Sequence, residues 1–133
     1  MGDFYLEIAA SPTICMGGDE YGLLLRVSPG MDFYRFALTC DGQTRVDRYY
    51  QGKASSPQPL TMSGVVPRGA PSSSLLAVHA VGNELHFYIN GEYQFTVRDP
   101  TLLKGGIGVF ARSAGEGQVT VNFSDLKVYQ AQP

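Results

Sequence analysis

The stretch LLAVHAVGNELHFYINGEYQFTVR, residues 75–98, decides the fold class of this chain. Apolar and polar side chains alternate along three runs that are rich in the β-branched and aromatic residues typical of strands. The pairs Gly82-Asn83 and Asn90-Gly91 separate the runs, and such pairs are typical of tight hairpin turns. The stretch therefore predicts three antiparallel strands in a sheet with one buried and one exposed face.

The first of these turns also predicts a register. With a two-residue loop at Gly82-Asn83, the apolar residues of both strands fall on one face. The opposite face then pairs His79 with His86 and Ala77 with Tyr88 across the hairpin. The apolar pairs on the buried face are Leu76 with Ile89, Val78 with Phe87 and Ala80 with Leu85.

The second turn predicts a longer loop. A loop of only Asn90-Gly91 would place Phe87 opposite Gln94 and mix the two faces of the sheet. A three-residue loop with Gly91 as a bulge avoids this, because Phe87 then finds a partner in Tyr93 or Phe95. We therefore expect the three-residue loop.

Short alternating runs of the same kind fill the rest of the chain. Strands are expected over residues 4–10, 21–28, 33–40, 44–50, 105–112 and 119–130. Ser11-Pro12 is expected to end the first strand, and a change of phase in the last one predicts a bulge at Asp125. Residues 51–74, with four prolines, predict a long irregular loop with one short strand around residues 60–62. Since helical periodicity is missing, the fold class is all-β, a two-sheet antiparallel sandwich.

Length and charge limit the possible functions. At 133 residues, the chain is expected to be a single domain over residues 1–133, burying roughly two thirds of its unfolded surface. A net charge of −2 with interspersed signs argues against nucleic acid as a partner. No apolar run is long enough for membrane insertion, and Met1-Gly2-Asp3 does not resemble a signal peptide. The domain is therefore either cytosolic or excised from a longer secreted chain.

Two cysteines, Cys15 and Cys40, bear on that choice. They are either two buried thiols or a disulfide. A disulfide that closes the loop between them would stabilise the fold by about 3 kcal/mol in the chain-entropy model. No metal-site pattern surrounds them. We expect the disulfide, which implies an oxidising compartment.

Six segments spread along the chain form a pattern in their order and spacing: residues 19–26, 33–36, 41–42, 85–91, 106–110 and 123–128. In this pattern the chain resembles bacterial domains of the concanavalin A-like lectin/glucanase superfamily, especially its laminin-G-like and keto-disaccharide-hydrolase-like branches. The resemblance implies a jelly roll of two antiparallel sheets, one of them concave. The chain lacks the Glu-x-Asp-x-x-Glu signature of the related glucanases, which argues against glucanase activity.

The chain also lacks the one or two strands that such domains usually carry ahead of the segment matching residues 3–10. An unpaired strand edge tends to pair with another chain. We therefore expect either a homodimer through the edge of the 4–10 strand or an upstream segment that supplies the strand. The alternative is that residues 119–130 cover the gap.

A set of planar hydrogen-bonding and aromatic side chains is expected to form one ligand face. Such a mixture binds sugars through hydroxyl hydrogen bonds and through stacking of their C–H faces. A glycosidase would need two carboxyl groups across one cleft, and only Glu7 and Asp47 are outward-facing strand carboxylates. The ligand face consists of Arg26, Arg35, Arg45, Asp47, Tyr49, His79, His86 and Tyr88.

Metal binding has two candidate places. His79 and His86 face each other, but a zinc site needs more donors than two imidazoles. The resemblance implies a structural calcium at Asp125, while an Asp that caps its own backbone is the simpler interpretation. No other cofactor is expected.

The sequence therefore predicts a non-catalytic, extracytoplasmic glycan-binding module of a larger bacterial protein, located outside the cell or on its surface. Its expected partner is an oligo- or polysaccharide. One alternative is a glycoside hydrolase-like enzyme acting on a disaccharide, in which the 51–74 loop supplies the missing groups. The other is a structural or protein-interaction module that binds no sugar.

Overall fold

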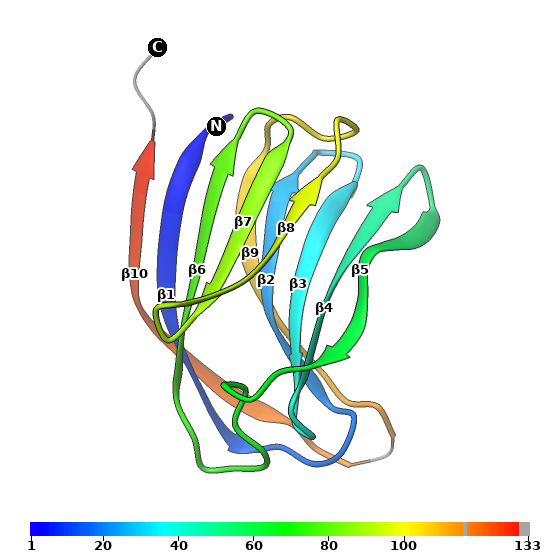
Figure 1. The fold of residues 1–133 in the computed structure, drawn as a ribbon. Helices are drawn as coiled ribbons and strands as arrows, with labels where there is room; N and C mark the ends of the chain where they lie inside the picture. The colour runs from blue at the N-terminus through cyan, green and yellow to red at the C-terminus, as the bar shows by residue number, and fades with distance from the viewer. Residues whose placement is uncertain (116, 131–133) are drawn as a thin grey trace.

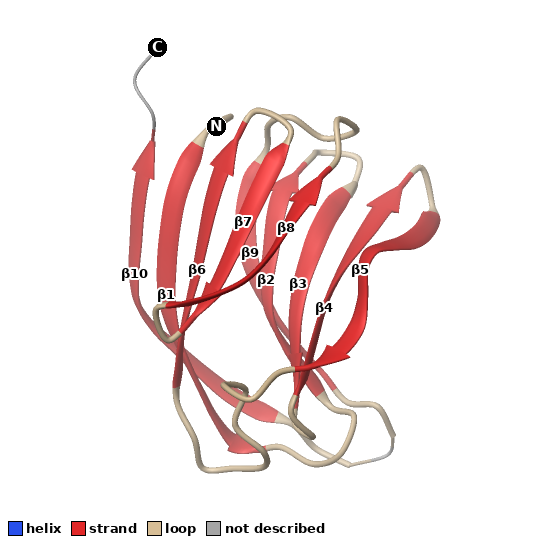
Figure 2. Ribbon diagram, viewed as in Figure 1, coloured by secondary structure: helices blue, strands red, loops and turns tan. Residues whose placement is uncertain are grey.

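Two antiparallel sheets packed face to face make up the fold in the computed structural model (Figure 1). The structure describes residues 1–115 and 117–130. Figure 2 shows strands and loops only, and the described part of the chain contains no helix that could span a membrane. The predicted all-β, two-sheet sandwich is confirmed.

Each sheet contains five strands. The sheet that we call the β1 sheet has the order β10 (Thr120–Gln130), β1 (Phe4–Ile14), β6 (Ser74–Val81), β7 (Glu84–Ile89) and β8 (Glu92–Arg98). The other, the β3 sheet, has the order β5 (Lys53–Met62), β4 (Gln43–Tyr50), β3 (Phe33–Thr39), β2 (Glu20–Val27) and β9 (Gly106–Arg112).

The core lies between the two sheets and is built from alternate residues of their strands. Phe36 of β3 and Phe87 of β7 are both fully buried, and their ring centroids lie 4.6 Å apart across the sandwich. Phe95 of β8 packs 5.4 Å from Phe87. Because the core takes every second side chain, the other half of each strand is left for the two outer faces.

The predicted register of the first hairpin is confirmed for all five pairs. Val78 lies opposite Phe87 on the core face, and His79 lies opposite His86 on the outer face. Gly82 has a φ of 58°, a left-handed conformation of the kind that a tight hairpin turn needs. One dipeptide therefore determines which side chains of β6 and β7 reach solvent.

The prediction of a three-residue second loop is wrong. The register shift that this loop was predicted to introduce is nevertheless present in the structure. The loop is Asn90-Gly91 alone, both residues have positive φ, and Ile89 lies opposite Glu92. The register shift falls inside the strand pair, between Phe87 and Tyr88. Because an Asn-Gly pair suits a two-residue turn, the turn is short and the bulge lies within the strand pair instead.

The first strand is longer than predicted, and its residues 4–10 have a partner strand on each side. It continues through Pro12, which lies opposite Val121, because β10 pairs with β1 along its whole length, while β6 pairs with the other side of residues 4–10. The unpaired edge that motivated the homodimer prediction is therefore absent, and residues 119–130 cover the gap. The predicted bulge is confirmed, since Asp125 has a φ of 58° at a register shift.

The irregular loop predicted over residues 51–74 is partly wrong. Residues Lys53–Met62 form the ten-residue edge strand β5, paired with β4 through two register shifts. Pro57 and Pro59 fit there because an edge strand has one side without ladder hydrogen bonds. The prolines therefore indicated an edge strand, not the absence of a strand.

The predicted disulfide between Cys15 and Cys40 is confirmed. The two Cα atoms lie 5.6 Å apart, and both residues are buried. Cys15 follows β1 and Cys40 follows β3, so the bond ties one sheet to the other.

Replacing both cysteines with alanine is expected to lower the free energy of unfolding by about 3 kcal/mol, because the cross-link restricts the unfolded chain. Urea unfolding of the double variant against the wild type measures this change. Thiol titration of the denatured, unreduced wild type should find no free cysteine. Equal unfolding midpoints, or two titratable thiols, would contradict the expectation.

Candidate functional site

The eight side chains predicted to form one ligand face lie in three different places. Alternation along a strand gives the side of its own sheet, but not which of the two sheets the strand joins. The outer face of the β3 sheet carries Arg35, Arg45, Asp47 and Tyr49. His79, His86 and Tyr88 lie on the outer face of the β1 sheet, and Arg26 lies in the interior. The prediction of a single face is therefore wrong.

Arg26 is not a ligand residue, because its side chain is fully buried. Its Nη1 donates hydrogen bonds to the carbonyl oxygens of Gly82 at 2.6 Å and Leu102 at 3.2 Å. Its Nη2 donates to the carbonyl oxygen of Gly2 at 3.1 Å. Arg26 sits at a bulge between β2 and β9 with a φ of 50°, which breaks the alternation on which the prediction depended. Burial lowers the pKa of Arg26, and the nearby Tyr34 and Asp3 oppose that shift.

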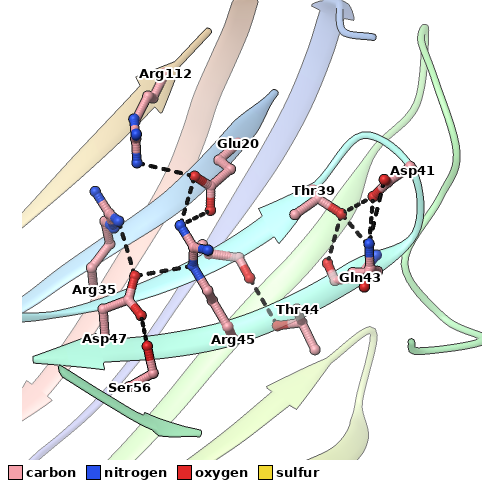
Figure 3. Close-up of polar contacts among 11 residues, drawn as sticks. Glu20, Arg35, Thr39, Asp41, Gln43, Thr44, Arg45, Asp47, Ser56 and Arg112 are labelled. Atoms are coloured by element: carbon pink, nitrogen blue, oxygen red, sulfur yellow. Dashed lines mark hydrogen bonds and ion pairs between the residues drawn. The ribbon is translucent and has the colours of Figure 1, made fainter. Parts of the chain in front are cut away.

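Five charged side chains on the outer face of the β3 sheet form a continuous set of ion pairs, which we call the arginine network (Figure 3). Its members are Glu20, Arg35, Arg45, Asp47 and Arg112. Arg45 is its centre, with Nη2 2.8 Å from Glu20 Oε2 and Nε 3.0 Å from Asp47 Oδ2. Both carboxylates also bind a second arginine: Arg35 Nη2 lies 2.9 Å from Asp47 Oδ2, and Arg112 Nη1 lies 3.3 Å from Glu20 Oε1.

Strand register explains how these residues meet. Arg35 of β3 lies directly opposite Asp47 of β4, and Glu20 of β2 lies directly opposite Arg112 of β9. Opposite charges placed across neighbouring strands stabilise a sheet modestly. Arg45, two residues before Asp47 on the same face, then bridges the two pairs.

Aromatic rings lie beside the network. The Arg35 guanidinium lies 4.9 Å from the Tyr49 ring centroid and 5.4 Å from that of Phe110. The side chains of Arg35 and Asp47 are 10% and 7% exposed, while those of Arg45 and Arg112 are 24% and 54% exposed. A ligand would therefore contact Arg45 and Arg112, with Glu20 holding both from beneath and Asp47 also holding Arg45.

Sequence reasoning missed Glu20, Phe110 and Arg112. The alternation of β9 does place Phe110 and Arg112 on one face of their strand. Nothing local shows that β9 pairs with β2, whose partner residues lie 79 to 92 positions earlier in the chain. The sequence therefore lacked the information on long-range strand pairing that would have identified these residues.

The histidine pair on the β1 sheet is confirmed as an accessible feature. The ring centroids of His79 and His86 lie 6.0 Å apart, and His79 is exposed. His86 Nδ1 is 2.8 Å from the hydroxyl oxygen of Thr96. The predicted side-by-side placement of His79, His86 and Tyr88 on an outer face is correct.

Glu7 and Asp47, the two carboxylates considered for glycoside hydrolysis, lie on different sheets and cannot act across one cleft. Among the residues the structure describes, no three His, Cys, Asp or Glu side chains could hold a metal ion together. Asp125 is exposed in its bulge, and calcium binding there stays a prediction.

Comparison with known proteins shows which solved structures share this architecture. No protein-family model matches the chain, and no curated protein matches it either. Carbohydrate-binding module CBM66 from Bacillus subtilis superposes with a TM-score of 0.71 at 16% identity, covering 98% of this chain and 76% of that one. Sheep galectin-11 in complex with glycerol superposes with a TM-score of 0.71 at 13% identity, covering 97% of this chain and 91% of that one.

A GH43 protein from Bacillus licheniformis has a TM-score of 0.73 at 13% identity. The match covers 98% of this chain but only 28% of that protein. Identities this low show the fold alone. The chain thus has the two-sheet jelly-roll architecture found in carbohydrate-binding modules and galectins.

Proposed function

We propose that the chain is a non-catalytic glycan-binding module that binds an oligo- or polysaccharide on the outer face of the β3 sheet. The observation that carries the proposal is the position of Arg45, fixed at 2.8 and 3.0 Å between two carboxylates. Tyr49 and Phe110 flank the same network with partly exposed rings. Fixed polar groups beside flat rings suit a ligand that is both hydroxyl-rich and ring-shaped.

Pre-organisation is the physical basis of this assignment. A free arginine side chain loses much rotamer freedom when it binds a ligand, and that loss weakens affinity. Ion pairs already fix Arg45 and Arg35 in place, so less entropy remains to be lost. The Arg45 guanidinium offers N–H donors that sugar hydroxyls can accept, while Glu20 and Asp47 hold it in place.

The absence of catalysis is proposed from the same contacts. Glu20 and Asp47 are carboxylates on one face, which is the feature that favours a hydrolase. Arginines bind both of them, and Ser56 Oγ donates a further hydrogen bond to Asp47 at 2.7 Å. The oxygens that would meet a water or a glycosidic oxygen are thus already engaged.

Two further observations support the proposal. The solved structure from Bacillus subtilis that the chain resembles is described as a carbohydrate-binding module. The Cys15–Cys40 disulfide is typical of proteins in oxidising compartments. We place the domain outside the cell or on its surface, as part of a larger bacterial protein.

The test is a glycan array probed with the wild type and with Arg45→Ala. Hydrogen bonds to a charged group contribute about 1.5–3 kcal/mol each, so the variant should bind roughly tenfold to a hundredfold more weakly. Arg98→Ala is the matched control, because Arg98 is also paired with a glutamate but lies on the other sheet. Undiminished binding by Arg45→Ala would contradict the assignment, and an array without any signal would favour the interaction module.

A further inference from the structure

A row of four rings crosses the outer face of the β1 sheet. Tyr129 of β10, Tyr5 of β1, His79 of β6 and His86 of β7 are successive register partners, so the row runs perpendicular to the strands. Neighbouring ring centroids lie 6.3, 6.3 and 6.0 Å apart. Together with Tyr88, we call these residues the tyrosine–histidine face.

A hollow opens beside this row because Ala77 is a small side chain between larger ones. Ala77 lies opposite Tyr88 on one side and Glu7 on the other. Tyr5, Leu75, His79 and Tyr88 also line the hollow, whose volume is about 200 Å³. Pockets for drug-sized ligands measure roughly 300–1,000 Å³, so this one suits a smaller unit such as a single sugar ring.

Most polar side-chain atoms of the tyrosine–histidine face are available to a ligand. The side chains of His79, Tyr88 and Tyr129 form no hydrogen bond with any other residue in the described part of the chain. In contrast, the Tyr5 hydroxyl already donates to Glu7 Oε2 at 3.1 Å. The tyrosine–histidine face thus combines ring surfaces with the phenols of Tyr88 and Tyr129 and the imidazole of His79, which can still donate or accept.

The charges around this face cancel one another. Glu7 lies 3.7 Å from Lys127 Nζ at one end, and Glu84 lies 2.9 Å from Arg98 Nε at the other. The hydrogen bond from Arg98 lowers the pKa of Glu84 against the opposing effect of desolvation, which keeps that carboxylate charged and paired. A face of aromatic rings whose neighbouring carboxylates are paired with cations favours an uncharged ligand.

We propose that the tyrosine–histidine face is a second, independent binding surface, for an uncharged oligosaccharide that lays one sugar ring over Ala77. The rest of the oligosaccharide follows the row of rings across the strands, where aromatic faces and their polar tips meet sugar C–H groups and hydroxyls. This face and the arginine network lie on opposite outer surfaces of the sandwich (Figure 1). One domain can therefore hold two glycan chains at once, and such two-site attachment raises avidity without new contacts.

The experiment follows backbone amide chemical shifts of ¹⁵N-labelled protein titrated with cellohexaose, xylohexaose and maltohexaose. At least one of these neutral probes is expected to shift Tyr5, Ala77 and Tyr88. Ala77→Leu fills the hollow from its floor and should weaken that binding at least tenfold. Asn122→Ala, at an exposed position of β10 on the same sheet but outside the hollow, should leave it unchanged.

The outcomes separate this proposal from the preceding one. Shifts confined to residues of the arginine network would overturn the second surface and leave the first intact. Shifts confined to the tyrosine–histidine face would support the second surface and contradict the first. The proposal is overturned if Ala77→Leu binds as tightly as the wild type, or if no probe shifts this face.

Discussion

Replacing Arg26 with methionine is expected to lower the free energy of unfolding by roughly 3 kcal/mol or more, because each buried acceptor left without a donor costs about 1–3 kcal/mol. Arg26 donates to carbonyl oxygens of three separate segments, at Gly2, Gly82 and Leu102. Methionine fills a similar volume but donates no hydrogen bond. The loss should appear as a lower urea midpoint in equilibrium unfolding.

Arg26→Lys is the matched variant for this prediction. Lysine keeps the positive charge and three donors, but it lacks the planar fork that reaches carbonyl groups in several directions. Its stability should fall between those of the wild type and Arg26→Met. Replacing a buried charge with an apolar side chain sometimes stabilises a protein, since the desolvation penalty disappears. A methionine variant as stable as the wild type would show that this gain outweighs the three hydrogen bonds.

The fold could be predicted from the sequence because its signals are local. Alternation and the Gly82-Asn83 turn are enough to fix the facing of β6 and β7, including the contact between His79 and His86. The bulge at Asp125 also left a trace, since the apolar phase changes there. Each of these features depends on residues within one or two strands.

The arginine network could not be predicted because its contacts are long-range. Arg35 and Asp47 lie on neighbouring strands joined by a short turn, and their shared face was predicted correctly. Glu20 and Arg112 meet only because β9 returns to pair with β2 after 92 residues. For the same reason, the sequence did not show that His79 and His86 lie on a different sheet from Arg35 and Asp47, and a single ligand face was predicted for all four.

Arg26 shows a different limit. In a strand without irregularities it would face solvent, as predicted from the alternation of residues 21–28. The structure places it at a bulge in a left-handed conformation, which is uncommon for a residue other than glycine. The alternation gave no sign of this bulge, whereas at Asp125 the apolar pattern changed phase.

Replacing Gly22 with alanine is expected to lower the free energy of unfolding by roughly 3 kcal/mol or more, since a buried clash that the backbone must relieve belongs among the strongest single-residue effects. Gly22 lies in β2, between β3 and β9, with a φ of 156°. A Cβ atom there would overlap the carbonyl oxygen of Phe36, a backbone atom that cannot swing aside as a side-chain end can. To relieve this overlap, β2 and β3 must move apart close to Glu20 and Arg35.

Gly52→Ala is the control, because Gly52 also has a positive φ of 77° but lies in an exposed turn with nothing within 4 Å of the added Cβ. The free energy of unfolding of Gly52→Ala should fall by about 1 kcal/mol, which is the cost of the backbone conformation alone. Urea unfolding of both variants against the wild type measures the two effects. If Gly22→Ala and Gly52→Ala lose the same stability, backbone conformation explains both, and the close approach of β2 to β3 at Phe36 does not constrain the sheet.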